Sequence, residues 1–112
     1  MSGRTTLADQ LAARAVALRG VVDGPSRFGS GKARAFTYHG KEFAHFHSAS
    51  VIDVRVGRKG AKRWKDDPRL IPRKSASDWV ELRIRGADDL DAVFEAVRIA
   101  YEEARARAKP KG

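Results

Sequence analysis

Residues 41–56 read KEFAHFHSASVIDVRV, and this stretch decides the fold of the chain. Apolar and polar side chains alternate on both sides of the small residues 48–50, a pattern typical of two β-strands joined by a short turn. We expect the strands to cover 41–47 and 51–56. The stretch therefore predicts an antiparallel hairpin.

The two faces of this hairpin differ in polarity, because side chains alternate across a sheet. The apolar face, extended by a later strand at 78–84, should meet the helices and consists of Ala44, Phe46, Ile52, Val54, Val56, Val80, Leu82 and Ile84. The second face is mixed and consists of Phe43, His45, His47, Val51, Asp53, Arg55, Trp79, Glu81 and Arg83.

The pairing of the two strands decides which polar side chains meet. If 48–50 is a three-residue loop, His47 lies opposite Val51 and His45 lies opposite Asp53, with Cβ atoms about 5 Å apart. A slip of one residue would move Asp53 to the other face, so a contact between His45 and Asp53 depends on this register.

Helical patterns stand at both ends of the chain. Thr6 and Asp9 have the spacing of a capping box before an amphipathic segment that runs towards Gly20. The last segment, from residue 87, has acidic residues in its first turn and a regular apolar stripe, which predicts a long helix.

The central elements complete the fold class. A strand is expected at 34–38 with a turn at His39-Gly40, and the basic stretch 58–70 reads as a short helix or helical turn ended by Pro68. The order predicts an α+β fold: a single antiparallel sheet, N- and C-terminal helices packed on one face, and a short basic helix between the later strands. We expect one domain over 1–112, with 1–4 and 108–112 frayed.

Composition narrows the classes of function. The chain has 112 residues and a net charge of +9. It contains no cysteine, so disulfides and thiolate chemistry are excluded. Neither a signal peptide nor a membrane span is visible, and we expect a cytoplasmic protein without a membrane partner. The positive charge favours nucleic acid or another polyanion as partner.

The charge is concentrated in residues 55–74, where nine basic residues face Asp66 and Asp67, a net charge of +7. A solvated face of a basic protein is the alternative. Trp64, inside this segment, is expected to pack on the core. The polyanion-binding candidates are Arg55, Arg58, Lys59, Lys62, Arg63, Lys65, Arg69, Arg73 and Lys74.

Three phrases, GPSRFGSGKARAF, KEFAHFHSASVIDVRV and SDWVELRIRGADDLDAVFEAVRIAYE, resemble the small bacterial family labelled luciferase domain. Ala44-His45-Phe46-His47, Asp53 and Trp79-Val80 stand at the places of its strand motifs, and the likeness covers about residues 24–102. The turn at 48–50 departs from the glycine-rich form of the family. The chain also resembles the MmcQ/YjbR-like group, which implies a frataxin-like α+β sandwich and suggests DNA binding.

His45, His47 and Asp53 are the candidate metal ligands, since imidazole and carboxylate suit zinc, iron or nickel. His45 with Asp53 could instead perform acid–base catalysis. The plainer alternative is a polar pair hydrogen-bonded to Asp53 and Glu81. No cofactor other than such a divalent metal is expected, and whether the chain is an enzyme stays open, with binding favoured.

The function favoured by the sequence is a small basic binding domain for a polyanion such as nucleic acid. A metal-binding or acid–base site at His45, His47 and Asp53 is one alternative. A protein–protein module that uses the open sheet face is another. Residues 27–34, RFGSGKAR, lack the spacing of a phosphate-binding loop and read as a turn. The candidate contacts on the sheet face are Phe43, His45, His47, Asp53, Trp79 and Arg83.

Overall fold

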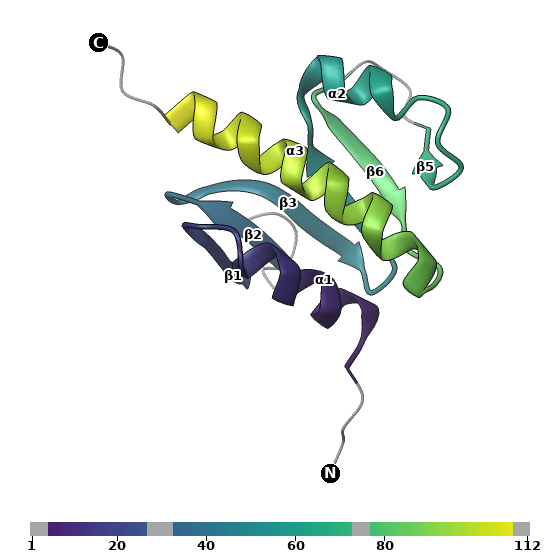
Figure 1. Cartoon of the computed structure of the whole chain (residues 1–112), viewed down its shortest axis with the longest axis horizontal. Coiled ribbons are helices and arrows are strands. Elements are labelled where there is room, and N and C mark those ends of the chain that lie inside the picture. Colours follow the sequence, from purple (N-terminus) through teal and green to yellow (C-terminus); the bar gives the residue numbers. More distant parts are fainter. Residues whose placement is uncertain (1–4, 27–32, 73–76, 109–112) are drawn as a thin grey trace.

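The chain forms one six-stranded antiparallel sheet with two helices, α1 and α3, across one face (Figure 1). A computed structural model describes residues 5–26, 33–72 and 77–108. The strand order is β1-β2-β3-β4-β6-β5. The elements are α1 (Leu7–Val16), β1 (Val21–Pro25), β2 (Arg34–Tyr38), β3 (Lys41–Ser48), β4 (Val51–Arg55), α2 (Gly57–Arg63), β5 (Leu70–Ile71), β6 (Trp79–Arg83), a 3-10 turn (Ala87–Asp89) and α3 (Leu90–Ala108).

The predicted α+β fold is therefore confirmed. Two edge strands, β1 and β5, were not predicted. The terminal segments expected to fray lie outside the described residues, apart from Ala108, which still belongs to α3. Most of the glycine-containing segment 27–34 lies outside them too.

The first helix begins as its sequence predicts. The Thr6 hydroxyl accepts the backbone N–H of Asp9 at 3.0 Å, and the Asp9 carboxylate accepts the backbone N–H of Thr6 at 3.2 Å. These bonds satisfy amides that have no partner within the helix. Leu11 and Ala15 are buried against the sheet and α3, which anchors α1 over the β1 side of the molecule.

The turn between β2 and β3 is formed by His39 and Gly40, as expected. Their φ angles are +51° and +79°, and two consecutive left-handed residues match the right-handed twist of the strands that they join. Glycine adopts this conformation at little cost. The turn therefore starts β3 in a fixed register with β2.

A bulge then shifts that register at Phe43. Phe36 pairs with Ala44 while Thr37 pairs with Glu42, so Phe43 is an extra residue on β3. The placement of Phe43 on the polar face was wrong: its side chain is 0% exposed and lies 6.3 Å, centroid to centroid, from the ring of Tyr101 on α3. Glu42 comes to the polar face as a result.

A second register shift falls at the other end of β3. Phe46 pairs with Ile52 and Ser48 pairs with Val51, which leaves His47 as the extra residue and Ala49-Ser50 as a two-residue loop. The expected three-residue loop and the pairing of His47 with Val51 were therefore wrong. His45 nevertheless lies directly opposite Asp53, as predicted, because the bulge compensates for the shorter loop.

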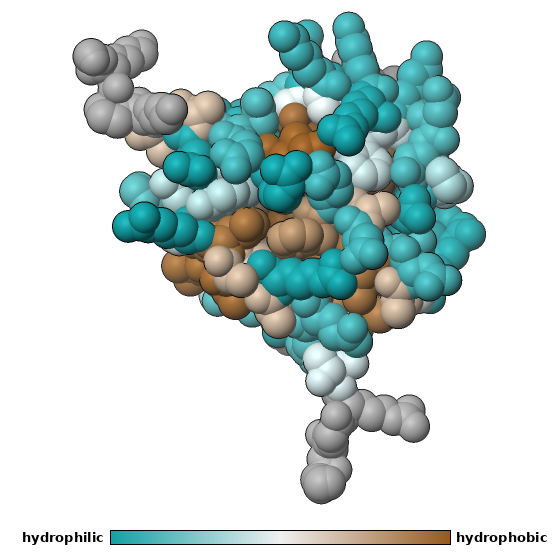
Figure 2. Space-filling model, in the orientation of Figure 1, coloured by the Kyte–Doolittle hydropathy of each residue, from teal (hydrophilic) through white to brown (hydrophobic). Residues whose placement is uncertain are grey.

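The core lies between the sheet and the two long helices. Trp64, which follows α2, is buried there, as expected for a packing residue. Figure 2 shows the helix-covered face, where hydrophilic side chains predominate and hydrophobic colour gathers over α1 and β1. Val16 and Val22, on these two elements, are the exposed large hydrophobic residues of the described chain.

Candidate functional site

A row of directly opposed residues crosses the sheet at the centre of its helix-free face. His45 on β3 pairs with Ala35 on one side and Asp53 on the other, and Asp53 pairs in turn with Glu81 on β6. His45 is thus placed between a small side chain and two carboxylates. The sheet itself, rather than a loop, fixes this arrangement.

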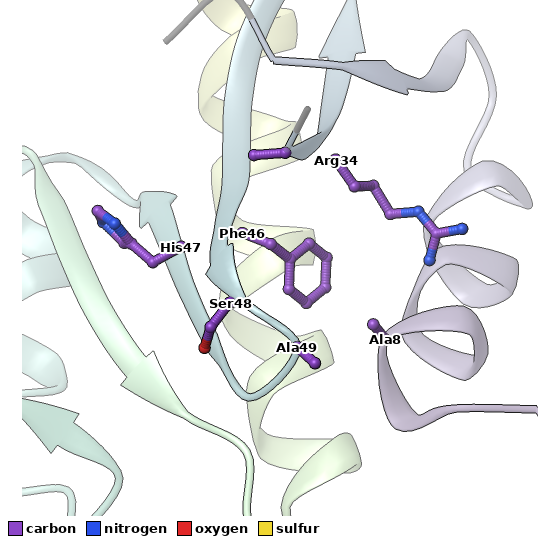
Figure 3. A pocket seen from close by; sticks show the side chains of 7 residues that line it. Ala8, Arg34, Phe46, His47, Ser48 and Ala49 are labelled. Carbon is purple, nitrogen blue, oxygen red and sulfur yellow. The ribbon is translucent and has the colours of Figure 1, made fainter. Parts of the chain in front are cut away.

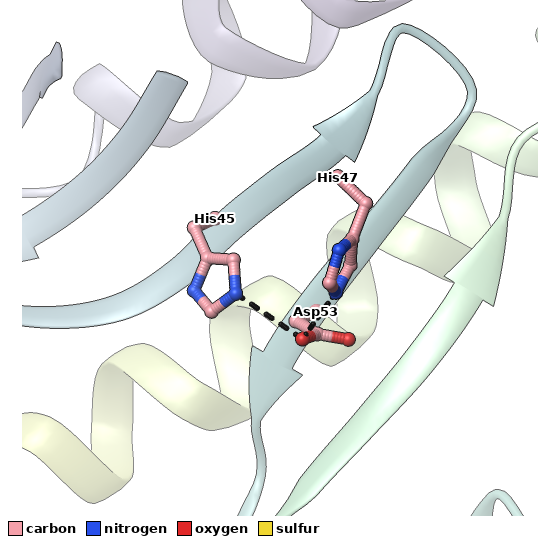
Figure 4. A group of neighbouring side chains, drawn as sticks. All are labelled: His45, His47 and Asp53. Atoms are coloured by element: carbon pink, nitrogen blue, oxygen red, sulfur yellow. Dashed lines mark hydrogen bonds and ion pairs between the residues drawn. The ribbon is translucent and has the colours of Figure 1, made fainter. Parts of the chain in front are cut away.

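Two histidines converge on one oxygen of Asp53 (Figure 4). His45 Nε2 lies 3.1 Å from Asp53 Oδ2, and His47 Nε2 lies 2.7 Å from the same atom. One ligand atom of each residue lies within 4.8 Å of the others, a group that could hold a metal ion. His47 is the extra residue of the bulge, and its side chain lies on the same face as that of His45.

The second nitrogen of His45 faces another carboxylate. His45 Nδ1 lies 3.1 Å from Glu42 Oε2, and the hydroxyl of Ser26 donates to the same oxygen at 2.9 Å. Sequence reasoning missed Glu42 and Ser26. Strict alternation placed Glu42 on the apolar side, and no residue at 42–44 is a glycine that would have signalled the bulge.

The side chains of the cluster differ in their exposure to solvent. The side chains of Glu42 and Asp53 are each 6% exposed, that of His45 is 13% exposed, and that of His47 is 50% exposed. The ring of Trp79 lies 5.1 Å from that of His45 and shields it. A ligand from solvent would therefore reach the cluster past His47.

The hollow near this end of β3 is a separate feature. It measures about 430 Å³ and is lined by Ala8, Ala33, Arg34, Phe46, His47, Ser48 and Ala49. Figure 3 shows Phe46 pointing towards α1, whereas the ring of His47 leaves β3 on the opposite side. His47 therefore belongs to both features: it lines the hollow, while its ring reaches Asp53 in the histidine cluster.

The remaining sheet-face candidates take different positions. Trp79 contributes to the cluster, as described. Arg83 is exposed and lies opposite Val51, on the neighbouring row. Ser48 and Ser50 act as turn residues, since the Ser48 hydroxyl accepts the backbone N–H of Ser50 at 3.2 Å.

The basic segment divides into paired and unpaired side chains. Arg69 is held by Asp89 at 2.7 Å and Asp67 at 3.1 Å, and the hydrogen bond with Asp89 is the main cause that raises the pKa of its guanidinium. Arg55 and Arg58 make long ion pairs with Asp78, at 3.7 and 3.9 Å. Arg69 therefore has a structural role in two short ion pairs, whereas the ion pairs of Arg55 and Arg58 are long.

Four basic side chains on or directly after α2 are exposed. In the described part of the chain, they make no ion pair within 4.0 Å of a carboxylate: Lys59, Lys62, Arg63 and Lys65. Arg73 and Lys74, also expected to bind a polyanion, lie outside the described residues. These four side chains form a basic surface at α2, which is distinct from the histidine cluster.

These features describe a small α+β domain with a histidine and carboxylate cluster on its helix-free face. The model of the family described as Luciferase domain matches residues 40–100, and the chain belongs to this family. The matched residues include the cluster from Glu42 to Trp79, while Ser26 lies before them. No curated protein matches the chain. Among the described helices, none has the length and apolar character needed to cross a membrane.

Proposed function

We propose that the protein binds a transition metal ion through His45, His47 and Asp53. The observation that carries this proposal is the convergence of two imidazole nitrogens on one oxygen of a buried carboxylate. Imidazole and carboxylate are the donors that zinc, iron and nickel accept, whereas magnesium and calcium prefer oxygen ligands alone. Three protein ligands leave a coordination position for water or a substrate.

Electrostatics supports the same reading. Two carboxylates, Glu42 and Asp53, lie beneath the surface of this face, and Glu81 stands directly opposite Asp53. Like charges opposed across a sheet are destabilising, and a buried carboxylate is costly without positive charge beside it. A divalent cation between the two histidines and Asp53 would supply that charge.

The experiment is calorimetric titration of the metal-free protein with Zn²⁺, repeated with a large excess of Mg²⁺ present. We expect one ion per chain and no competition from Mg²⁺. His47→Ala and Asp53→Asn should each weaken binding by more than about 100-fold, since they remove a ligand and not merely its support. His39→Asn is the control, because it removes the turn histidine. Unchanged binding in the first two variants would refute the proposal.

A second candidate function is binding of a polyanion, such as nucleic acid in the cytoplasm, by the basic surface of α2. The observation that favours it is the set of exposed cations Lys59, Lys62, Arg63 and Lys65, which have no carboxylate within 4.0 Å among the described residues. Arg107, at the end of α3, adds to this charge. Burial, and then the nearby guanidinium of Arg55, lowers the pKa of Arg107, so an anion bound between the two would relieve their repulsion.

This candidate is tested by replacing Lys59, Lys62 and Arg63 with Gln and measuring binding to a labelled DNA duplex. We expect clearly weaker binding, because these side chains would neutralise phosphates. The control removes three charges elsewhere, at Arg14, Arg19 and Lys41. Equal losses in the two triple variants would mean that only net charge matters and would refute a defined surface.

A further inference from the structure

Glu42 is a buried carboxylate that the bulge at Phe43 brings to the polar face of the sheet. Its Oε2 atom lies 3.1 Å from His45 Nδ1 and accepts the Ser26 hydroxyl at 2.9 Å. Ser26 is itself buried, directly after β1. Three strand regions, β1, β3 and β4, therefore contribute to one line of contacts that runs Ser26, Glu42, His45, Asp53 and His47.

The contacts of His45 bear on which of its two ring nitrogens carries a proton. Glu42 Oε2 lies at an ion-pair distance of 3.1 Å from His45 Nδ1, and a carboxylate beside a ring nitrogen favours a proton on that nitrogen. A ring nitrogen that keeps its proton cannot bind a metal. The ring nitrogen left for a metal is Nε2, the atom that lies 3.1 Å from Asp53 Oδ2, on the same side as His47 Nε2. With a metal ion bound at Asp53, Nε2 would face the ion, and Nδ1, beside Glu42, would keep the proton.

We propose that Glu42 is a positioning residue for the metal site, which holds the proton on His45 Nδ1 and so presents Nε2 to the ion, and that Ser26 fixes Glu42 in place. This inference rests on the proposed metal-binding function. It also accounts for the burial of Glu42, because a carboxylate shielded from water interacts more strongly with the imidazole. Carboxylates in such outer positions orient the ring and raise the basicity of the metal-binding nitrogen.

The first readout is metal affinity. Glu42→Ala should weaken Zn²⁺ binding by about 10- to 100-fold, the usual effect of removing an outer carboxylate. Glu42→Gln should recover much of this loss, because its amide oxygen also accepts from Nδ1–H. Ser26→Ala should have a smaller effect. Glu81→Gln is the matched control: it removes a charge opposite Asp53 without a contact to His45, and the affinity should change less than with Glu42→Ala.

The second readout needs no metal. Nitrogen NMR of the metal-free protein should show His45 Nδ1 protonated in the wild type, and this proton should no longer be fixed in Glu42→Ala. If Glu42→Ala fails to fold, the same NMR measurement is made on Glu42→Asp. This variant keeps the charge, but its side chain is too short to reach Nδ1, so the proton should again no longer be fixed. Unchanged affinity and an unchanged Nδ1 proton would overturn the inference. A wild type without metal affinity would refute the proposed function, while the NMR result would still judge the role of Glu42.

Discussion

Asp53 shows how a single residue can define this site. Its carboxylate is nearly buried, yet both histidine side chains of β3 contact the same oxygen. A buried charge is tolerated only where partners surround it. At the residue scale, the proposed metal binding therefore depends on which groups neutralise a carboxylate that the sheet has removed from water.

Asp89 is a second carboxylate with specific partners, and its role is structural. It accepts the backbone N–H of Arg85 at 2.7 Å and the guanidinium of Arg69 at 2.7 Å. The hydrogen bond from Arg85 is the largest cause that holds the pKa of Asp89 below its usual value, although burial opposes it. Asp89 thus ties the start of α3 to the loop before β5.

We predict that Asp89→Ala lowers the free energy of unfolding at pH 7 by about 1.5–3 kcal/mol, the range for hydrogen bonds to a charged group. Because the pKa is lower in the folded state than in the unfolded chain, this contribution is complete above an unfolded-state pKa of about 3.9. It is lost as the pH falls from there through the lower folded pKa. Urea unfolding at pH 7 and near pH 3 measures this change, with the exposed Asp88→Ala as control. A deficit that stayed constant with pH would contradict this assignment.

At the scale of elements, β3 determines both the core and the site. Its bulge at Phe43 turns an aromatic ring into the core and a glutamate to the opposite face, and its bulge at His47 brings a second imidazole to Asp53. Alternation predicted the hairpin, the facing pair of His45 and Asp53, and the apolar set of β4 and β6. It could not predict the bulges, because their energy comes from packing between strands and helices rather than from residues within β3.

The first prediction at this scale concerns the core position of Phe43. Phe43→Ala should destabilise the fold by about 3–5 kcal/mol, since it leaves a cavity beside Tyr101. Val22→Ala on β1 is the control, because that side chain is 60% exposed and should cost little. Urea unfolding compares the two. If Phe43→Ala changed the free energy of unfolding as little as Val22→Ala, the result would contradict the burial of Phe43 in the core.

The second prediction concerns the turn from β2 to β3. A Cβ atom at Gly40 would meet no atom within 4 Å, so the cost of Gly40→Ala comes from its φ angle of +79° alone. We expect a loss of about 1–2 kcal/mol. Gly86→Ala is the matched control, since a Cβ atom there is equally unobstructed and its φ angle is −166°. Thermal unfolding should show a lower Tm for the first variant only, and equal Tm values would argue against a left-handed turn.

At the scale of the whole molecule, the two proposed functions occupy different regions. The histidine cluster lies on the helix-free face of the sheet, whereas the exposed cations lie on α2, beside α3 and β6 (Figure 1). The excess of positive charge was evident from composition. Its division was not evident, because ion pairs depend on contacts distant in sequence: Arg69 pairs with two carboxylates, whereas Lys59, Lys62 and Arg63 have none within 4.0 Å among the described residues.

Salt dependence tests the charged surface as a whole. If α2 contacts a nucleic acid, the logarithm of the affinity for a DNA duplex should fall linearly with the logarithm of salt concentration. The double variant Lys59→Gln, Lys62→Gln should reduce the slope by about two, one unit for each lost phosphate contact. Fluorescence anisotropy at several salt concentrations measures it. An unchanged slope would place the contacts elsewhere.

The most direct measurement of the central claim is anomalous X-ray diffraction from crystals grown with one equivalent of Zn²⁺, recorded on both sides of the zinc absorption edge. We predict a single anomalous peak within about 2.0–2.2 Å of His45 Nε2, His47 Nε2 and a carboxylate oxygen of Asp53, with His45 Nδ1 still directed at Glu42. A peak elsewhere, or no peak while Asp53 still contacts both histidines, would contradict the account.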